Sequence, residues 1–164
     1  MRRTAVLFLT LLLLWALVAE MNHALSPAHV WLFAGGLFVA YAALALPLAP
    51  GLAAVILAGC VFDAHAPVAF GTHAALFAIA HLLIHNARDR LPRDETGAHV
   101  LIALTANFGL FLALSLDCAR RAPASGAEWF RLLADLACSQ VFVALIARWF
   151  FALQARALKL AAAG

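Results

Sequence analysis

The hydrophobic residues of this chain gather in six long runs, and short polar segments separate them. Most of these runs approach the roughly 20 apolar residues that an α-helix needs to cross the hydrocarbon core of a bilayer. The pattern therefore predicts an all-α, polytopic membrane protein with about six transmembrane helices. We expect residues 1–164 to form a single integral-membrane domain, with spans at 4–22, 28–46, 50–65, 68–85, 99–117 and 129–151.

Prolines and polar residues mark the ends of the runs. Pro47 and Pro50 follow the second run, where proline removes a backbone donor and disfavours helix in the residue before it. The longest hydrophilic connector covers residues 85–95. The first run follows two arginines, as in a secretory signal, and Ala19 offers a cleavage point. We read this run as the first transmembrane helix, because every later run is equally apolar.

The basic residues predict an orientation. Six spans place both termini on one side of the membrane, and that side would carry most of the Arg and Lys residues. Arg120 and Arg121 lie on the opposite side and fit less well. Because basic loops stay in the cytoplasm, we expect both termini to be cytoplasmic. The residues collected on that side are Arg2, Arg3, Arg88, Arg90, Arg93, Arg148, Arg156 and Lys159.

Composition supports the membrane class. Hydrophobic residues make up 66% of the chain and charged residues 12%, about half of the charged fraction that is usual in a soluble domain. The net charge of +3 comes from residues that flank apolar runs, and they do not line a groove with interleaved aromatics. We therefore expect contacts with anionic lipid head groups and none with nucleic acid.

The candidates for metal or redox chemistry are few. Cys60, Cys118 and Cys138 lack the spacing of metal ligands, and we interpret them as structural. His81 and His85, four residues apart, would share one helix face as zinc ligands can, but no third ligand is evident. We expect neither a metal nor a cofactor.

Motifs for catalysis are also missing from the sequence. None of the serines stands in a glycine-flanked nucleophile elbow. The pair Gly35-Gly36 lacks the lysine and the spacing of a phosphate-binding loop. We expect a protein that is not an enzyme.

Asp63 is the most informative polar residue, because it lies at the outer edge of the third apolar run. A carboxylate at that position needs a partner. Its oxygens can accept hydrogen bonds from the amides of the turn that starts the next helix. An interface with another protein and a role in transport or catalysis are the alternatives. Small residues on the third and fourth helices predict that these two helices pack closely.

The segment around Asp63 resembles the central motif of the rod-shape-determining protein MreD family. In that motif a glycine precedes an aspartate by four residues, a second glycine follows the aspartate by eight, and a small residue comes soon after. Gly59, Asp63, Gly71 and Ala74 match in order and spacing. The chain departs from the family at Pro67, since Ala66-Pro67 stands where a serine-glycine turn is common.

The resemblance implies a non-enzymatic membrane scaffold of the bacterial elongation complex, which directs cell shape and lateral peptidoglycan synthesis at the inner membrane. Its implied partner is a bitopic scaffold of the MreC type. Through that scaffold it would meet a RodA-type glycosyltransferase, a class B penicillin-binding protein and MreB. Asp63 and Gly71 would then shape an outer turn, and the connector with Arg88, Arg90 and Arg93 would meet cytoplasmic partners.

Two further functions stay open. The family resembles, in size and span number, the S-component fold of energy-coupling-factor transporters, which implies as an alternative a substrate-binding membrane subunit of a vitamin transporter. Such a subunit needs a roomy outer pocket with converging polar groups, which the sequence scarcely provides. A lipid-modifying enzyme is disfavoured by the shortage of polar residues inside the apolar runs.

Overall fold

The described part of the chain is entirely helical. The structure is a computed structural model and describes residues 2–90, 96–121 and 126–163, within which there is no strand. The α-helices are α1 (Arg2–Leu25), α2 (Gly35–Ala45), α3 (Leu48–His65), α4 (Thr72–Ala87), α5 (Thr96–Arg121) and α6 (Gly126–Ala163), with short 3-10 turns η1 (Ser26–Ala28) and η2 (Arg88–Arg90).

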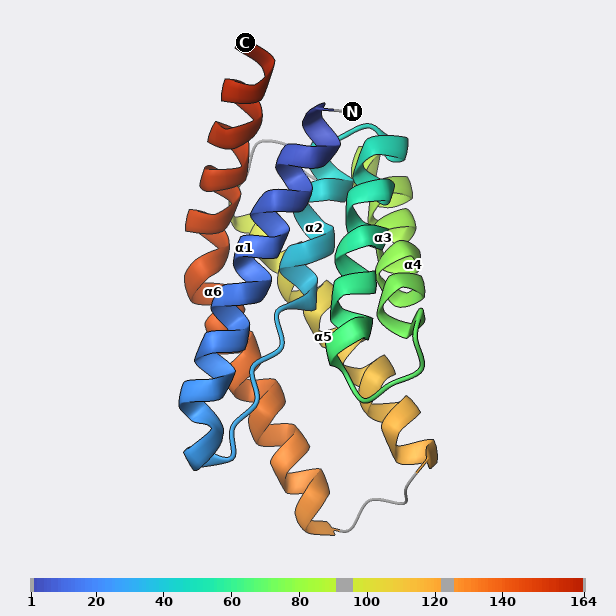
Figure 1. The fold of residues 1–164 in the computed structure, drawn as a ribbon, viewed down its shortest axis with the longest axis vertical. Coiled ribbons are helices and arrows are strands. Elements are labelled where there is room, and N and C mark those ends of the chain that lie inside the picture. Colours follow the sequence, from blue (N-terminus) through green and yellow to red (C-terminus); the bar gives the residue numbers. More distant parts are fainter. Residues whose placement is uncertain (1, 91–95, 122–125, 164) are drawn as a thin grey trace.

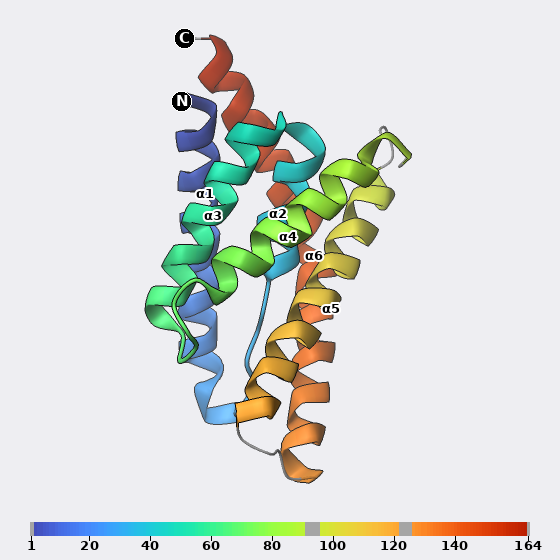
Figure 2. The ribbon, with the colours of Figure 1, turned by 90° about the vertical axis from the view of Figure 1, so that its right-hand side faces the viewer.

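Helix α2 lies at the centre of the bundle. The other five helices surround it in the order α1, α3, α4, α5, α6, and each contacts the next around the ring (Figure 1). Eight of the 11 residues of α2 are buried, as expected for a helix that is apolar on every face. Figure 2 shows α1 and α3 on one side of the bundle and α5 on the other, while α6 runs from the side of α5 to the start of α1. The two termini lie at the same end (Figure 1).

Four helical segments of the described chain are long and apolar enough to cross a membrane, which confirms the coarse prediction of an all-α chain with membrane-compatible helices. The two other helices are shorter. Helix α2 has 11 residues and spans only about 16 Å at 1.5 Å per residue. The four segments are Arg2–Ala28, Leu48–His65, Gly97–Arg120 and Glu128–Ala161.

The second predicted span, 28–46, is wrong in its first part. Residues 29–34 are not helical, and α2 begins only at Gly35. The apolar pattern could not reveal this, because the groups that replace helical hydrogen bonds come from distant helices. Similarly, residues 68–71 belong to the turn before α4, and α6 extends beyond the predicted 129–151 at both ends.

Helices α3 and α4 pack closely, as the small residues predict. A Cβ atom on Gly59 would lie 2.5 Å from the Cα of Ala74, so a side chain at this position would force the two backbones apart. Gly36 plays the same part between α2 and α5, where a Cβ would lie 2.0 Å from the carbonyl oxygen of Ala103. Close backbone approach at small residues is how helices associate in lipid.

Candidate functional site: the turn held by Asp63

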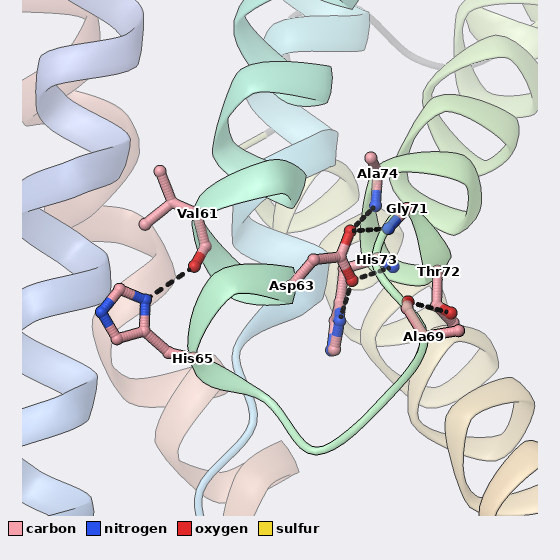
Figure 3. Close-up of polar contacts among 8 residues, drawn as sticks. All are labelled: Val61, Asp63, His65, Ala69, Gly71, Thr72, His73 and Ala74. Carbon is pink, nitrogen blue, oxygen red and sulfur yellow. Dashed lines mark hydrogen bonds and ion pairs between the residues drawn. The ribbon is translucent and has the colours of Figure 1, made fainter.

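The carboxylate of Asp63 joins the last turn of α3 to the first turn of α4. Asp63 is buried, and each of its two oxygens accepts two hydrogen bonds (Figure 3). Oδ2 accepts from the backbone amides of Gly71 at 3.0 Å and Ala74 at 3.2 Å. Oδ1 accepts from the backbone amide of His73 at 2.8 Å and from its ring nitrogen Nδ1 at 2.9 Å.

These bonds satisfy the amides that a helix start leaves without partners. The amide of Thr72 donates to Ala69 at 3.1 Å, and the amide of Ala75 donates to Gly71 at 2.9 Å as the first bond of the helical ladder. Asp63 accepts from the amides of the other residues at this helix start. It therefore caps α4 from a different helix, which confirms the expected contact between its oxygens and the amides of this turn.

Gly71 gives the turn its backbone shape. Its φ is +97°, a left-handed conformation that residues with a side chain rarely adopt. No atom lies within 4 Å of the position that a Cβ on Gly71 would take. The requirement for glycine here comes from the backbone conformation and not from crowding.

The structure thus brings four of the five motif residues together. Gly59 permits the approach of Ala74, Asp63 binds the amide of Ala74, and Gly71 turns the chain between them. Pro67 lies apart, exposed on the connecting turn. Phe70 is 74% exposed on the same turn, so the braced turn presents apolar surface outward.

His73 is a member of this site that the sequence analysis missed. Its buried ring stacks on Phe62, with ring centroids 5.4 Å apart, and meets Phe77 edge-on at 6.0 Å. Because an ionised carboxylate only accepts, the hydrogen must sit on Nδ1 of His73. The available signal was its spacing: ten residues after the capping aspartate, it falls in the first turn of the next helix.

A second polar cluster, also missed, holds the non-helical segment 29–34. Buried Asn22 of α1 both donates to the carbonyl of Leu32, at 3.0 Å, and accepts from its amide, at 2.7 Å. Two further amides of the segment, and one in the first turn of α2, donate to side chains of α5 and α6. These bonds are Trp31 to Asp135 at 2.9 Å, Phe33 to Ser139 at 2.9 Å and Gly36 to Asn107 at 3.1 Å.

At the opposite end of α4, Arg88 is partly buried and donates from Nη1 to the carbonyl of Leu46 at 3.2 Å. Arg90 is exposed on η2, and Arg93 lies outside the described residues. His81 and His85 share a face of α4, as predicted, with ring centroids 5.8 Å apart. The described residues contain no group of three or more side chains suited to hold a metal ion.

An open apolar groove of about 380 Å³ lies on α6. Its lining is formed by neighbouring positions of this one helix and includes no charged side chain. The lining residues are Ala137, Cys138, Val141, Phe142 and Leu145.

The chain was compared with known proteins at the level of families, single proteins and structures. No family model, curated protein or solved structure matches it.

Proposed function

We propose that this protein is a non-enzymatic scaffold that works inside a membrane by presenting helix faces and a rigid turn to other proteins. The observation that carries the proposal is the use of the buried polar side chains. Asp63 binds the backbone at the start of α4, and Asn22, Asn107, Asp135 and Ser139 bind the backbone of residues 31–36. In each of these five side chains an oxygen accepts a hydrogen bond from a backbone amide of the same chain, which stabilises the fold.

We further propose that the scaffold belongs to the bacterial elongation complex. The resemblance of Gly59, Asp63, Gly71 and Ala74 to the MreD motif supports this assignment. In this reading the chain spans the inner membrane six times with both termini in the cytoplasm. It binds an MreC-type scaffold and, through it, a RodA-type glycosyltransferase, a class B penicillin-binding protein and MreB.

The geometry favours a scaffold over a substrate-binding transporter subunit. In transporters, a broken membrane helix often points its N-terminal amides at a substrate. Here the amide of Gly36, at the start of α2, donates to Asn107, and the amide of Phe33 donates to Ser139. The apolar groove on α6 offers no charged group to orient a polar ligand. The S-component reading therefore remains the second proposal.

The test is purification of the tagged full-length protein from its native membrane in mild detergent, followed by mass spectrometry of bound proteins. We expect an MreC-type scaffold together with wall-synthesis enzymes. Recovery of an ATPase pair with a coupling subunit would contradict the scaffold proposal and establish the transporter reading.

A charge reversal tests the cytoplasmic contact separately. We expect Arg90→Glu to reduce recovery of partners that bind on the cytoplasmic side, because Arg90 is exposed on η2 beside the connector. Arg156→Glu, also at an exposed arginine but on α6, is the matched control and should leave recovery unchanged. Equal losses in both variants would argue against a contact at η2.

A further inference from the structure

The C-terminal end of α4 meets the C-terminal end of α2. Nδ1 of His85 lies 3.2 Å from the carbonyl oxygen of Ala43, and Nη1 of Arg88 donates to the carbonyl of Leu46 at 3.2 Å. The last carbonyls of a helix have no donor within that helix. Arg88 therefore supplies a donor to the end of α2, and His85 supplies a second one when its Nδ1 carries hydrogen.

The same nitrogen of His85 also lies 3.3 Å from Nη1 of Arg88. A ring nitrogen of histidine either carries hydrogen and donates, or has a lone pair and accepts. The contact with Ala43 needs Nδ1 to donate, whereas the contact with Arg88 needs it to accept. The two contacts therefore belong to different hydrogen positions on the ring.

In the neutral ring with hydrogen on Nε2, Nδ1 accepts from Arg88. Nη1 of Arg88 has two hydrogens, so it can donate to His85 and to Leu46 together. A second proton on the ring removes this arrangement, because both nitrogens then donate. The imidazolium and the guanidinium would face each other as like charges 3.3 Å apart, which is unfavourable.

The side chain of Arg88 can move away from the protonated ring of His85. Its side chain is 34% exposed, so the guanidinium can turn toward water, and Asp89 lies on the exposed side with Oδ1 4.0 Å from Nε of Arg88. His85 is partly buried, and in the protonated ring its Nδ1 can donate to the carbonyl of Ala43, which makes Arg88 the mobile partner of the two.

Among residues 2–90, 96–121 and 126–163, few other ionisable groups surround His85. On α4, His81 is fully buried and stacks on His85, and neither ring nitrogen of His81 has a hydrogen-bond partner among the described residues. Residues 42–58 of α2 and α3 include no ionisable side chain. Tyr41 of α2 and His99 of α5 both face Phe151 of α6. Beyond α4, Arg90 is exposed on η2.

We propose that His85 is a proton-dependent switch for Arg88. The neutral ring holds Arg88 against the end of α2, and the protonated ring releases it to the surface beside Arg90. Release adds an accessible positive charge at the end of the molecule that carries both termini. The switch rests on contacts within this chain and goes beyond the scaffold proposal, because it does not depend on which protein binds there.

The test measures how accessible Arg88 is as a function of pH. The full-length protein in bilayer discs of uncharged phosphatidylcholine is treated with phenylglyoxal, and mass spectrometry gives the modification rates of Arg88 and Arg90. Dividing the first rate by the second removes the pH dependence of the reagent. We expect the ratio to rise several-fold between about pH 8 and about pH 5, where histidine changes charge.

The variant His85→Gln should keep the ratio constant, since the glutamine amide can donate and accept but does not titrate in this range. His65→Gln, at the far end of α3, is the matched control and should respond like the wild type. A flat wild-type ratio, or an equal rise in His85→Gln, would overturn the proposal.

The ¹⁵N resonances of the wild-type His85 ring give a check that needs no variant. Their pH midpoint must coincide with the pH midpoint of Arg88 labelling, and a different midpoint would also overturn the proposal.

Discussion

At the scale of single residues, Asp63 and Gly71 do different work in the same turn. Asp63 accepts from the backbone amides of Gly71, His73 and Ala74 at the start of α4, whereas Gly71 supplies a backbone conformation. One role depends on the number of acceptor atoms and the other on φ. Substitutions that change only one of these properties therefore separate the two roles.

Asp63→Asn removes one acceptor oxygen and places an NH₂ group against amides that also donate. We expect the free energy of unfolding to fall by about 1–3 kcal/mol, the cost of leaving buried donors without partners. Thermal unfolding of the purified protein in detergent, followed by tryptophan fluorescence, measures the change. Glu20→Gln, an exposed acid on α1, is the control and should leave the midpoint unchanged. Equal midpoints for Asp63→Asn and the wild type would refute the capping role.

Gly71→Ala forces a side chain onto a residue with φ of +97°. We expect a loss of about 1–2 kcal/mol in the free energy of unfolding, because the left-handed conformation is strained for residues with a Cβ. Gly109→Ala is the matched control: it also has no atom within 4 Å of an added Cβ, but it lies within α5. There alanine should stabilise the helix by roughly 0.5–1 kcal/mol. Effects of the same sign at both positions would contradict the conformational explanation.

At the scale of elements, the segment before α2 is stabilised by side chains of two other helices, α1 and α6. Asn22 makes two of these hydrogen bonds, so one substitution at this position removes both. Asn22→Leu would leave the amide and the carbonyl of Leu32 without partners. We expect faster hydrogen exchange at the amides of residues 31–34, measured by mass spectrometry, and a lower unfolding midpoint.

Asn86→Leu is the control for that exchange measurement, because Asn86 is exposed on α4 and far from the segment in sequence. Its exchange pattern at residues 31–34 should match the wild type. If Asn22→Leu also matched the wild type there, the hydrogen bonds of Asn22 would contribute little to the order of this segment.

The same segment shows where sequence-based prediction stopped. The apolar runs indicated where the helices of the described chain lie, because helix position follows from local hydrophobicity, but they did not predict the short length of α2. The bond from Trp31 to Asp135 joins residues 104 positions apart, and no local pattern encodes such a pairing. The contact of Asp63 with the start of α4 was predictable, since only eight residues separate it from Gly71.

At the scale of the whole molecule, the alternating course of the helices gives a prediction for topology. The termini lie at one end of the bundle, and the C-terminal end of α5 lies at the other (Figures 1 and 2). Cys118 belongs to the last turn of α5. If both termini are cytoplasmic, the six-span arrangement places Cys118 on the opposite side of the membrane. It is exposed and has no disulfide partner, so a membrane-impermeant maleimide can report its side.

In the variant Cys60→Ala, Cys138→Ala, Cys118 is the only thiol, and we expect it to be labelled in intact spheroplasts. The control variant has a single thiol, on η2, and should react only after the membrane is permeabilised. It carries the substitutions Cys60→Ala, Cys118→Ala, Cys138→Ala and Arg90→Cys. In the six-span arrangement, five membrane crossings precede Cys118. An odd number of crossings places Cys118 on the opposite side of the membrane from the N-terminus, so the labelling tests this arrangement directly. Labelling of both thiols from one side would exclude the six-span arrangement. Labelling of the η2 thiol alone would reverse the orientation and place Arg88 and its histidine switch outside the cytoplasm.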